Sequence, residues 1–339
     1  MSHEIEGNNI AYANEVPWHG LGTKMDPAAG YKAWMKAAAL DWEVKKLPMF
    51  TNLPNKKNIE VHGKNGQPYG VLVRDHGNNE FDQKDVFGPV GPEWVPVQND
   101  EVFEFMHGFC KGGDMTMETC GSLKGGTEIW ALLKIQSDFD VGKNDPITGH
   151  LLFHSAHVWG KGNSFGVTPV RVVCNNTLRM ALGNGNSLYR MPHVNIFDAE
   201  MQDKAKEAVG MADGQMQVYK NNAKFLAGKK ADEETIAQMI AEIYMPNKTI
   251  EVVRGETIQD HFSPTADIVM NCVSHSPGAD LNTAKGTWWG AFNGVTYYED
   301  HMRMSYVDDS NILASTWFGN GARRKALAMS KCLAYAEEA

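Results

Sequence analysis

The sequence predicts an α+β fold: an antiparallel sheet with long β-hairpins packed by helices, plus an inserted α-helical arm. Residues 151–159 divide between two faces with a period of two, which is typical of a strand. Two strand-like runs, 115–123 and 128–135, flank Lys-Gly-Gly at 124–126, which is a hairpin turn. Residues 196–227 are rich in Ala, Lys, Glu, Gln and Met, and this composition favours a long amphipathic helix.

The centre of the predicted fold is the segment from Asp145 to Leu182. We expect it to contain, in order, a turn at 145–149, a strand at 151–159, a turn at 160–162, a strand at 165–174 and a helix beginning at 177–182. Asn175 and Asn176 are favourable N-cap residues for that helix. The segment is therefore predicted to be a long hairpin that runs into a helix.

The other predicted elements are helices at 31–40, 100–108, 233–244, 276–301 and 321–338, and strands at 41–47, 59–61 and 69–74. Glycines at 63 and 66 indicate a turn that would make the last two strands a hairpin. We divide the chain into three parts: 1–195, a mainly β-hairpin core with flanking helices; 196–245, the helical arm; and 246–339, a C-terminal helical segment that packs on the core.

Composition excludes several classes of protein. The chain has 32 Lys and Arg against 41 Asp and Glu, a net charge of -9, so any contact with nucleic acid would need a local basic surface. Five widely spaced cysteines without Cys-x-x-Cys argue against a disulfide framework or a zinc site and fit a reducing compartment. No apolar run approaches ~18 residues, and the N-terminus lacks a signal-peptide pattern. We expect a cytosolic protein without a membrane partner.

Several motifs together resemble a known family. They are Trp-His-Gly-Leu-Gly at 18–22, Leu-Leu-Phe at 151–153, Thr-Pro-Val-Arg-Val-Val-Cys-Asn-Asn-Thr-Leu at 168–178, Gly-Thr-Trp-Trp-Gly-Ala-Phe-Asn-Gly-Val-Thr-Tyr-Tyr-Glu-Asp-His at 286–301, and Trp-Phe-Gly-Asn-Gly at 317–321. In this order they are similar to the phage- and plasmid-like proteins built on domain of unknown function 932. The resemblance spans nearly the whole chain and implies a role in replication, recombination or host takeover, without a settled activity.

The chain departs from the pattern of that family at one turn. Members carry a turn similar to His-Asp-Gly-Ser between the two hairpin strands, whereas this chain has His-Val-Trp-Gly-Lys-Gly-Asn at 157–163, with no Asp. A role for that acid therefore does not transfer to this chain, and binding is favoured over catalysis at the hairpin.

The hairpin carries a local excess of positive charge. Between residues 143 and 190 there is one acid, Asp145, against five basic residues: Lys143, Lys161, Arg171, Arg179 and Arg190. Trp159 and Phe165 are aromatic residues of the same stretch that look exposed. Cations track phosphates and aromatic rings stack on unpaired bases, so the pattern fits single-stranded nucleic acid. The alternative is a solvated charged face over a packed core.

A second basic cluster follows a glycine turn near the C-terminus. Arg323, Arg324 and Lys325 lie in the first turns of the predicted last helix, where free N–H groups can hold a phosphate. Cations there oppose the helix dipole, so an anion or an acidic neighbour is needed, and Asp308 and Asp309 are candidates. The motif is not a P-loop.

Other chemistry-bearing residues favour structural roles. His150 and His154 share a strand face but lack an identified third ligand, so no metal or other cofactor is predicted. Cys174 ends a buried-looking strand, which favours packing. No catalytic signature is present, so we expect a non-enzymatic protein. A hydrolase whose acids converge only in the fold stays an alternative, marked by DNA turnover that EDTA abolishes.

These patterns lead to two main hypotheses. The first is a phage or plasmid DNA-metabolism protein that binds single-stranded DNA as a homo-oligomer and anneals complementary strands in recombination or replication. Its candidate binding residues are Lys143, Trp159, Lys161, Arg171, Arg179, Arg323, Arg324 and Lys325. A hairpin followed by a helix also occurs in single-strand annealing proteins, which is a fold-level analogy. The second is a non-enzymatic phage protein that binds a host or phage protein, in host takeover or anti-defence.

Overall fold

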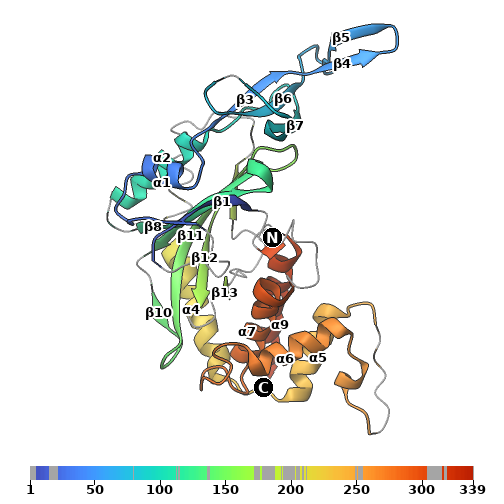
Figure 1. Cartoon of the computed structure of the whole chain (residues 1–339). Coiled ribbons are helices and arrows are strands. Elements are labelled where there is room, and N and C mark those ends of the chain that lie inside the picture. The colour runs from blue at the N-terminus through green and yellow to red at the C-terminus, as the bar shows by residue number, and fades with distance from the viewer. Residues whose placement is uncertain are drawn as a thin grey trace.

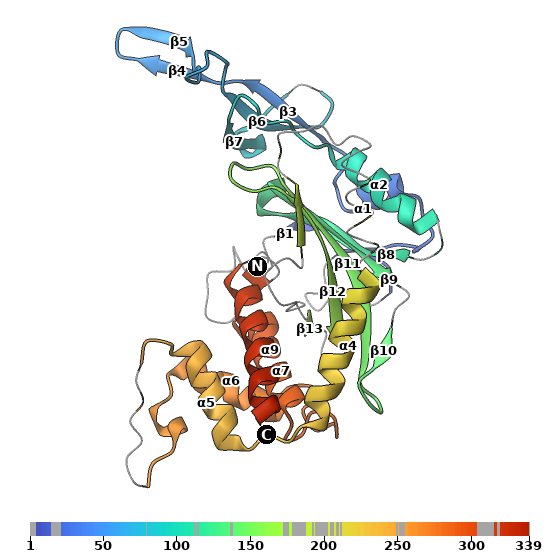
Figure 2. The ribbon, with the colours of Figure 1, turned by 180° about the vertical axis from the view of Figure 1, so that it is seen from behind.

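The structure is a computed structural model of the whole chain (Figure 1). It describes residues 5–14, 22–78, 80–111, 113, 115–135, 138–171, 176–177, 188–191, 193, 203, 207, 210, 212–248, 250, 255–303, 315–316 and 319–338. Helices and antiparallel sheets occur together in these residues, which confirms the predicted α+β class. The molecule is elongated, with a two-stranded ribbon at one end, helices at the other and the main sheet between them (Figures 1 and 2).

The main sheet is built around the predicted hairpins. Among the described residues its strands lie in the order β13-β12-β11-β9-β8-β1-β2, with β10 paired to β11 and β14 paired to β12. Their bounds are β1 Ile5–Tyr12, β2 Thr23–Lys24, β8 Met115–Leu123, β9 Glu128–Ile135, β10 Phe139–Asp140, β11 Pro146–Ala156, β12 Asn163–Arg171, β13 Asn176–Thr177 and β14 Leu188–Met191. Neighbouring strands are antiparallel except β1 and β2, which are parallel.

The central hairpin differs from the prediction at both ends. β11 begins at Pro146, so residues 146–149, expected in a turn, pair with β10 and β12 instead. β11 ends at Ala156, which places Trp159 in the turn rather than in the strand. Residues 176–177 form strand β13 against β12, so the expected helix does not begin at Thr177. The rest of that expected helix lies outside the described residues.

A smaller sheet and a ribbon precede the main sheet in the chain. The small sheet has the order β3-β6-β7, with bounds β3 Glu43–Pro48, β6 Gly70–Asp75 and β7 Val86–Val90. β4 (Phe50–Leu53) pairs with β5 (Lys56–Glu60) in a separate two-stranded ribbon. The predicted hairpin between 59–61 and 69–74 is confirmed at its turn, where His62 and Pro68 form an antiparallel bridge and the Tyr69 N–H donates to the Val61 carbonyl at 2.8 Å. The strands on either side do not pair with each other: β5 pairs with β4, and β6 pairs with β3 and β7.

Helices cover the sheet and form a bundle beyond it. Their bounds are α1 Tyr31–Ala37, α2 Asn99–Lys111, α4 Ala212–Gly228, α5 Glu233–Tyr244, α6 Pro264–His275, α7 Trp288–Tyr297 and α9 Asn320–Glu338, with 3-10 turns η1 Gln83–Asp85, η2 Lys124–Gly126 and η3 Ile258–His261. A π-helical turn, η4 (Tyr298–Met302), continues α7. α1 and α2 lie against the sheet, and α5, α6, α7 and α9 form the bundle (Figure 1).

Local signals explain where the bundle helices begin. The Asp232 side chain accepts a hydrogen bond from the Thr235 N–H at 2.9 Å and caps α5, and Ser263 caps α6 in the same way. The apolar face of α5 is buried, as at Ile236 and Ile240. Gly294 allows α6 and α7 to pack closely, because a Cβ at this position would lie 2.6 Å from the Cα of Val273.

One apolar core links the sheet to the helices. α4, expected in a helical arm, buries Met216, Tyr219, Ala223 and Leu226 in that core, alongside the buried face of α5. The described part of residues 196–245 thus packs on the body of the molecule, since its apolar stripe needs a partner. The three-part division of the chain stays a prediction. Among the described helices, none combines the length and apolar character needed to cross a bilayer.

Candidate binding site

An open cleft lies where the small sheet meets the turn of the central hairpin. Its volume is about 550 Å³, within the range of small-molecule sites. Its lining comes from three separate segments of the chain: Gly63, Lys64, Asn65, Tyr69, Gly91, Pro92, Glu93, Trp94, Trp159 and Gly160. Three of these residues are aromatic, so the cleft presents ring faces rather than aliphatic side chains.

Two aromatic rings form one wall of the cleft. Trp159 and Tyr69 are stacked, with ring centroids 6.5 Å apart and planes 18° apart. Trp159 is 61% exposed, the largest exposed fraction among the apolar side chains that the structure describes as exposed. Gly91 leaves room for this ring, because a Cβ there would lie 2.9 Å from the Trp159 indole. A flat aromatic surface of this kind is suited to stacking against another flat ring.

Lys46 fixes the backbone of residues 91–94, which line the cleft. The Lys46 Nζ donates hydrogen bonds to the carbonyl oxygens of Gly91, Pro92 and Trp94, at 3.0, 2.6 and 3.2 Å. Burial lowers the pKa of Lys46. Trp94 in turn stacks on His193, with ring centroids 4.0 Å apart. Residues 91–94 are therefore held by Lys46 of β3 and by the stacking of Trp94 on His193.

A buried carboxylate anchors the hairpin turn that carries Trp159. Glu128 on β9 is buried and accepts hydrogen bonds from Lys124 at 3.0 Å and from Lys161. Its other oxygen lies 2.8 Å from the Nε2 of His154. Burial alone would raise the pKa of Glu128, but the hydrogen bonds from His154 and Lys161 outweigh burial and hold that pKa well below its ordinary value.

His157 anchors the opposite side of the same turn. Its backbone N–H donates to the carbonyl of Thr127 at 2.7 Å, and its ring Nε2 lies 3.2 Å from the Oδ1 of Asn99. Its ring stacks on Phe87, with ring centroids 5.9 Å apart. Burial lowers the pKa of His157 to about 3, with a smaller contribution from nearby His193. The contacts of Glu128 and of His157 together hold the turn and so fix the position of Trp159.

The rim of the cleft is balanced in charge. Lys64 is exposed beside Asn65, and Glu93 is exposed across from them. Lys161 lies just beyond the turn and is 44% exposed, although its ammonium is paired with Glu128. With one cation and one anion on the rim, stacking rather than charge would supply most of the binding energy.

The predicted binding residues of the hairpin do not lie together. Trp159 and Lys161 are at one end of β11, in the turn. Lys143 is exposed beyond the other end, roughly 35 Å away along an eleven-residue strand. The backbone of Arg171 pairs with Ile147 near Lys143.

The remaining hairpin candidates add little to a common surface. The Arg171 side chain lies outside what the structure describes, as do all of Arg179 and the Arg190 side chain. Phe165, expected to be exposed, is 1% exposed and packs on Phe153 with ring centroids 4.6 Å apart, so that expectation was wrong.

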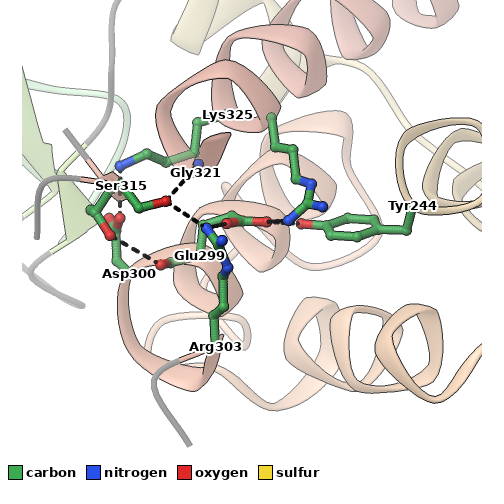
Figure 3. A network of polar contacts seen from close by, with 9 residues as sticks. Tyr244, Glu299, Asp300, Arg303, Ser315, Gly321 and Lys325 are labelled. Carbon is green, nitrogen blue, oxygen red and sulfur yellow. Dashed lines mark hydrogen bonds and ion pairs between the residues drawn. The ribbon is translucent and has the colours of Figure 1, made fainter. Parts of the chain in front are cut away.

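Two of the three basic residues at the start of α9, Arg324 and Lys325, form ion pairs with acids of the protein itself (Figure 3). The Lys325 Nζ donates to Asp300 at 2.6 Å, and both side chains are almost wholly buried. Arg324 donates to Glu299 at 3.3 Å, whereas Arg323 is exposed. A phosphate role for these residues stays a prediction, but Lys325 offers no surface for one.

Glu299 gathers the rest of this buried network (Figure 3). It is fully buried and accepts hydrogen bonds from the Tyr244 hydroxyl at 2.9 Å and from Arg303 at 3.0 Å. Burial, reinforced by Glu299, raises the pKa of Tyr244 well above its ordinary value. The acidic neighbours of the α9 cations are therefore Glu299 and Asp300 of the π-helical turn. Asp308 and Asp309, the expected partners, lie outside the described residues.

Sequence reasoning missed most of the cleft. Tyr69 was assigned only to a strand, and Trp94, Gly91 and Lys46 carried no signal, because the cleft exists only once three distant segments meet. In the described ranges, no group of three His, Cys, Asp or Glu side chains is placed to hold a metal ion. His154, one of the two histidines that share a strand face, is engaged by Glu128.

The fold and site define an α+β protein with an open cleft lined by aromatic residues at the tip of its central hairpin. Residues 86–329 match the family described as Domain of unknown function (DUF932), and because this match covers more than half of the chain, the chain belongs to that family. No curated protein and no solved structure matches the chain. The match includes Trp159 and the buried network, whereas Lys64 and Tyr69 precede it.

Proposed function

We propose that this chain binds single-stranded DNA and that unpaired bases stack in the aromatic cleft. The observation that carries the proposal is Trp159, which is 61% exposed and stacked on Tyr69 at the edge of an open cleft. Burying an exposed ring against a base contributes about 1–3 kcal/mol for each base. Duplex bases are stacked on each other and cannot enter such a cleft, so the geometry favours an unpaired strand.

The wider setting is part of the same proposal. Phages and plasmids require proteins that hold single strands during recombination and replication, and this chain would serve there in the host cytosol. Annealing needs two strands held at once, so we propose a homo-oligomer in which each copy supplies one cleft. A hairpin followed by a helix also occurs in annealing proteins, and this fold-level analogy supports the step.

A labelled oligonucleotide tests the proposal. We expect fluorescence anisotropy at low salt to show binding of an oligothymidylate to the full chain. Replacing Trp159 by Ala should weaken this binding about 5- to 150-fold, the equivalent of one lost stack. Phe225→Ala is the matched control, because Phe225 is also an exposed aromatic residue but lies on α4. Absence of binding at low salt, or equal loss in both variants, would refute the proposal.

Net charge favours one rival function. The chain carries -9, which repels nucleic acid at long range and suits a basic protein partner. In that case, a pull-down from host lysate would recover one stoichiometric protein, and nuclease treatment would not change its recovery. The same pull-down with Trp159→Ala would show whether the cleft is the docking site for that protein.

A further inference from the structure

The ribbon β4–β5 stands apart from the rest of the protein. It projects from the small sheet at one end of the molecule (Figures 1 and 2). Every side chain of β4 and the first three of β5 are exposed. Phe50 is 56% exposed and Leu53 is 50% exposed. Pro54 and Asn55 form the two-residue tip between the strands.

A ribbon of this kind is poorly stabilised on its own. An isolated two-stranded hairpin is marginal in water, and here the pairing is also irregular between Thr51 and Leu53. One side-chain bond helps to hold it, from the Asn58 N–H to the Asn52 Oδ1 at 3.0 Å. Its two exposed apolar side chains, Phe50 and Leu53, are accessible to a partner that would also steady the ribbon.

The charge of the ribbon identifies the kind of partner. Residues 50–60 contain Lys56 and Lys57 against one acid, Glu60, which lies at the end of the ribbon away from the tip, so the ribbon is net positive although the whole chain carries -9. Both lysines are exposed at the tip. The ribbon also presents Asn52, Asn55 and Asn58, whose amides can donate and accept hydrogen bonds. This combination of cations and amides complements a polyanion with hydrogen-bonding edges, which is nucleic acid.

We propose that the ribbon β4–β5 binds duplex DNA. A two-stranded antiparallel ribbon has the width that a DNA groove admits, and strands in a groove are an established way of reading a duplex. Lys56 and Lys57 contact phosphates on either side of the groove. Leu53 and Pro54 at the tip are the kinds of side chain that insert between base steps and bend the helix.

This surface is distinct from the aromatic cleft. A protein that pairs strands would hold an unpaired strand in the cleft and the duplex product on the ribbon, but duplex binding by the ribbon does not depend on that role. The two surfaces also differ in physics: stacking dominates in the cleft, whereas phosphate contacts at the ribbon tip make duplex binding dependent on salt.

The test measures the affinity of the full chain for a labelled duplex of about 30 base pairs between about 50 and about 200 mM salt. Lys56→Gln combined with Lys57→Gln should weaken binding about tenfold at the lower salt and reduce the slope of log affinity against log salt by about 1.8. The matched control is Lys224→Gln with Lys285→Gln, which removes two exposed charges from the body of the protein and should bind as the wild type does.

A second variant tests the tip without changing charge. Leu53→Ser should reduce the bend of the duplex, measured by energy transfer between its labelled ends, while the salt slope stays at the wild-type value. Both variants change exposed side chains, so their folding is checked simply by an unchanged melting temperature.

Three results would overturn the inference. The first is wild-type affinity for duplex in the Lys56→Gln, Lys57→Gln variant, and the second is an equal loss of affinity in the control variant. The third is a change in the molecular mass of the lysine variant in solution without a change in its duplex affinity, which would make a second copy of the chain the partner of the ribbon. The cleft is judged separately. If the wild-type chain binds duplex but no single strand, the proposed function fails and the ribbon inference stands. If it binds single strand but no duplex, the ribbon inference fails and the proposed function stands.

Discussion

The buried ion pair between Lys325 and Asp300 gives a sharp test of the C-terminal packing. The two side chains are 1% and 4% exposed, and the ammonium lies 2.6 Å from the carboxylate. Lys325→Met keeps the length and apolar stem of the side chain but removes the charge. Asp300 then stays buried without its ammonium partner, and the cost of desolvating that carboxylate is no longer offset.

The expected loss is large. Removing one partner of a buried ion pair costs about 3–5 kcal/mol. For a chain of 339 residues, the entropy of unfolding converts this loss into a fall in melting temperature of about 4–7 °C. Adding Asp300→Leu to Lys325→Met should restore part of this loss, because the second change removes the carboxylate that the first left behind.

Scanning calorimetry at neutral pH measures the effect. Lys134→Met is the matched control, since Lys134 pairs with Asp138 at 3.3 Å but both side chains are at least a third exposed. An exposed pair contributes less than about 1 kcal/mol, so the control should melt within about 1 °C of the wild type. If Lys325→Met melts with the control, the buried network does not stabilise the bundle as described.

Two further changes have outcomes that the structure determines. Gly91→Ala places a Cβ 2.9 Å from the Trp159 ring, so the ring must move. The affinity for single-stranded DNA should fall, while the melting temperature changes little. An unchanged affinity would show that the position of the Trp159 ring does not matter for binding. Burial lowers the pKa of His157 to about 3 and of His150 and His193 to about 4, from 6.5. Because these folded-state pKa values are depressed, stability present above about pH 6.5 should be lost as the pH falls toward 4, by up to about 1.4 kcal/mol per pH unit for each histidine. Urea denaturation at several pH values checks this, with a shallower slope expected for His157→Gln, and equal midpoints at pH values near 7 and near 5 would contradict it.

Elements with strong local signals were predicted correctly. The hairpin of β8 and β9 has the predicted bounds, because Gly125 and Gly126 adopt positive φ angles that other residues resist. α5 also has its predicted bounds, since Asp232 caps its start and Pro246 follows its end. In both cases the information lies within a few residues of the boundary.

Features that depend on tertiary contacts could not be predicted. Residues 145–149 contain Asp, Pro and Gly and look like a turn, yet pairing with β10 and β12 extends β11 through Pro146. The cations of α9 were expected to need a phosphate or Asp308 and Asp309 as partners, but Arg324 pairs with Glu299 and buried Lys325 pairs with Asp300, both in a π-helical turn. A π-helical turn has no sequence pattern of its own, and such turns are frequent at functional sites.

The candidate site was predicted only in part. Trp159 was singled out as an exposed-looking aromatic residue in the basic stretch 143–190, and it lines the cleft. Tyr69 and Trp94 reach the same place from other segments, and no spacing in the chain marks that meeting. Lys143 and Trp159 seemed neighbours in one basic stretch, but the length of β11 separates them.

Photocrosslinking tests the central claim most directly. An oligothymidylate carrying one 5-iodouracil, which crosslinks to an aromatic ring stacked against it, is irradiated with the full chain and the attachment site is mapped by mass spectrometry. We predict attachment to Trp159 or Tyr69. This attachment should be lost when an excess of unlabelled strand competes for the cleft. Attachment to α9 near Arg323, or to no aromatic residue of the cleft, would contradict base stacking at the hairpin tip.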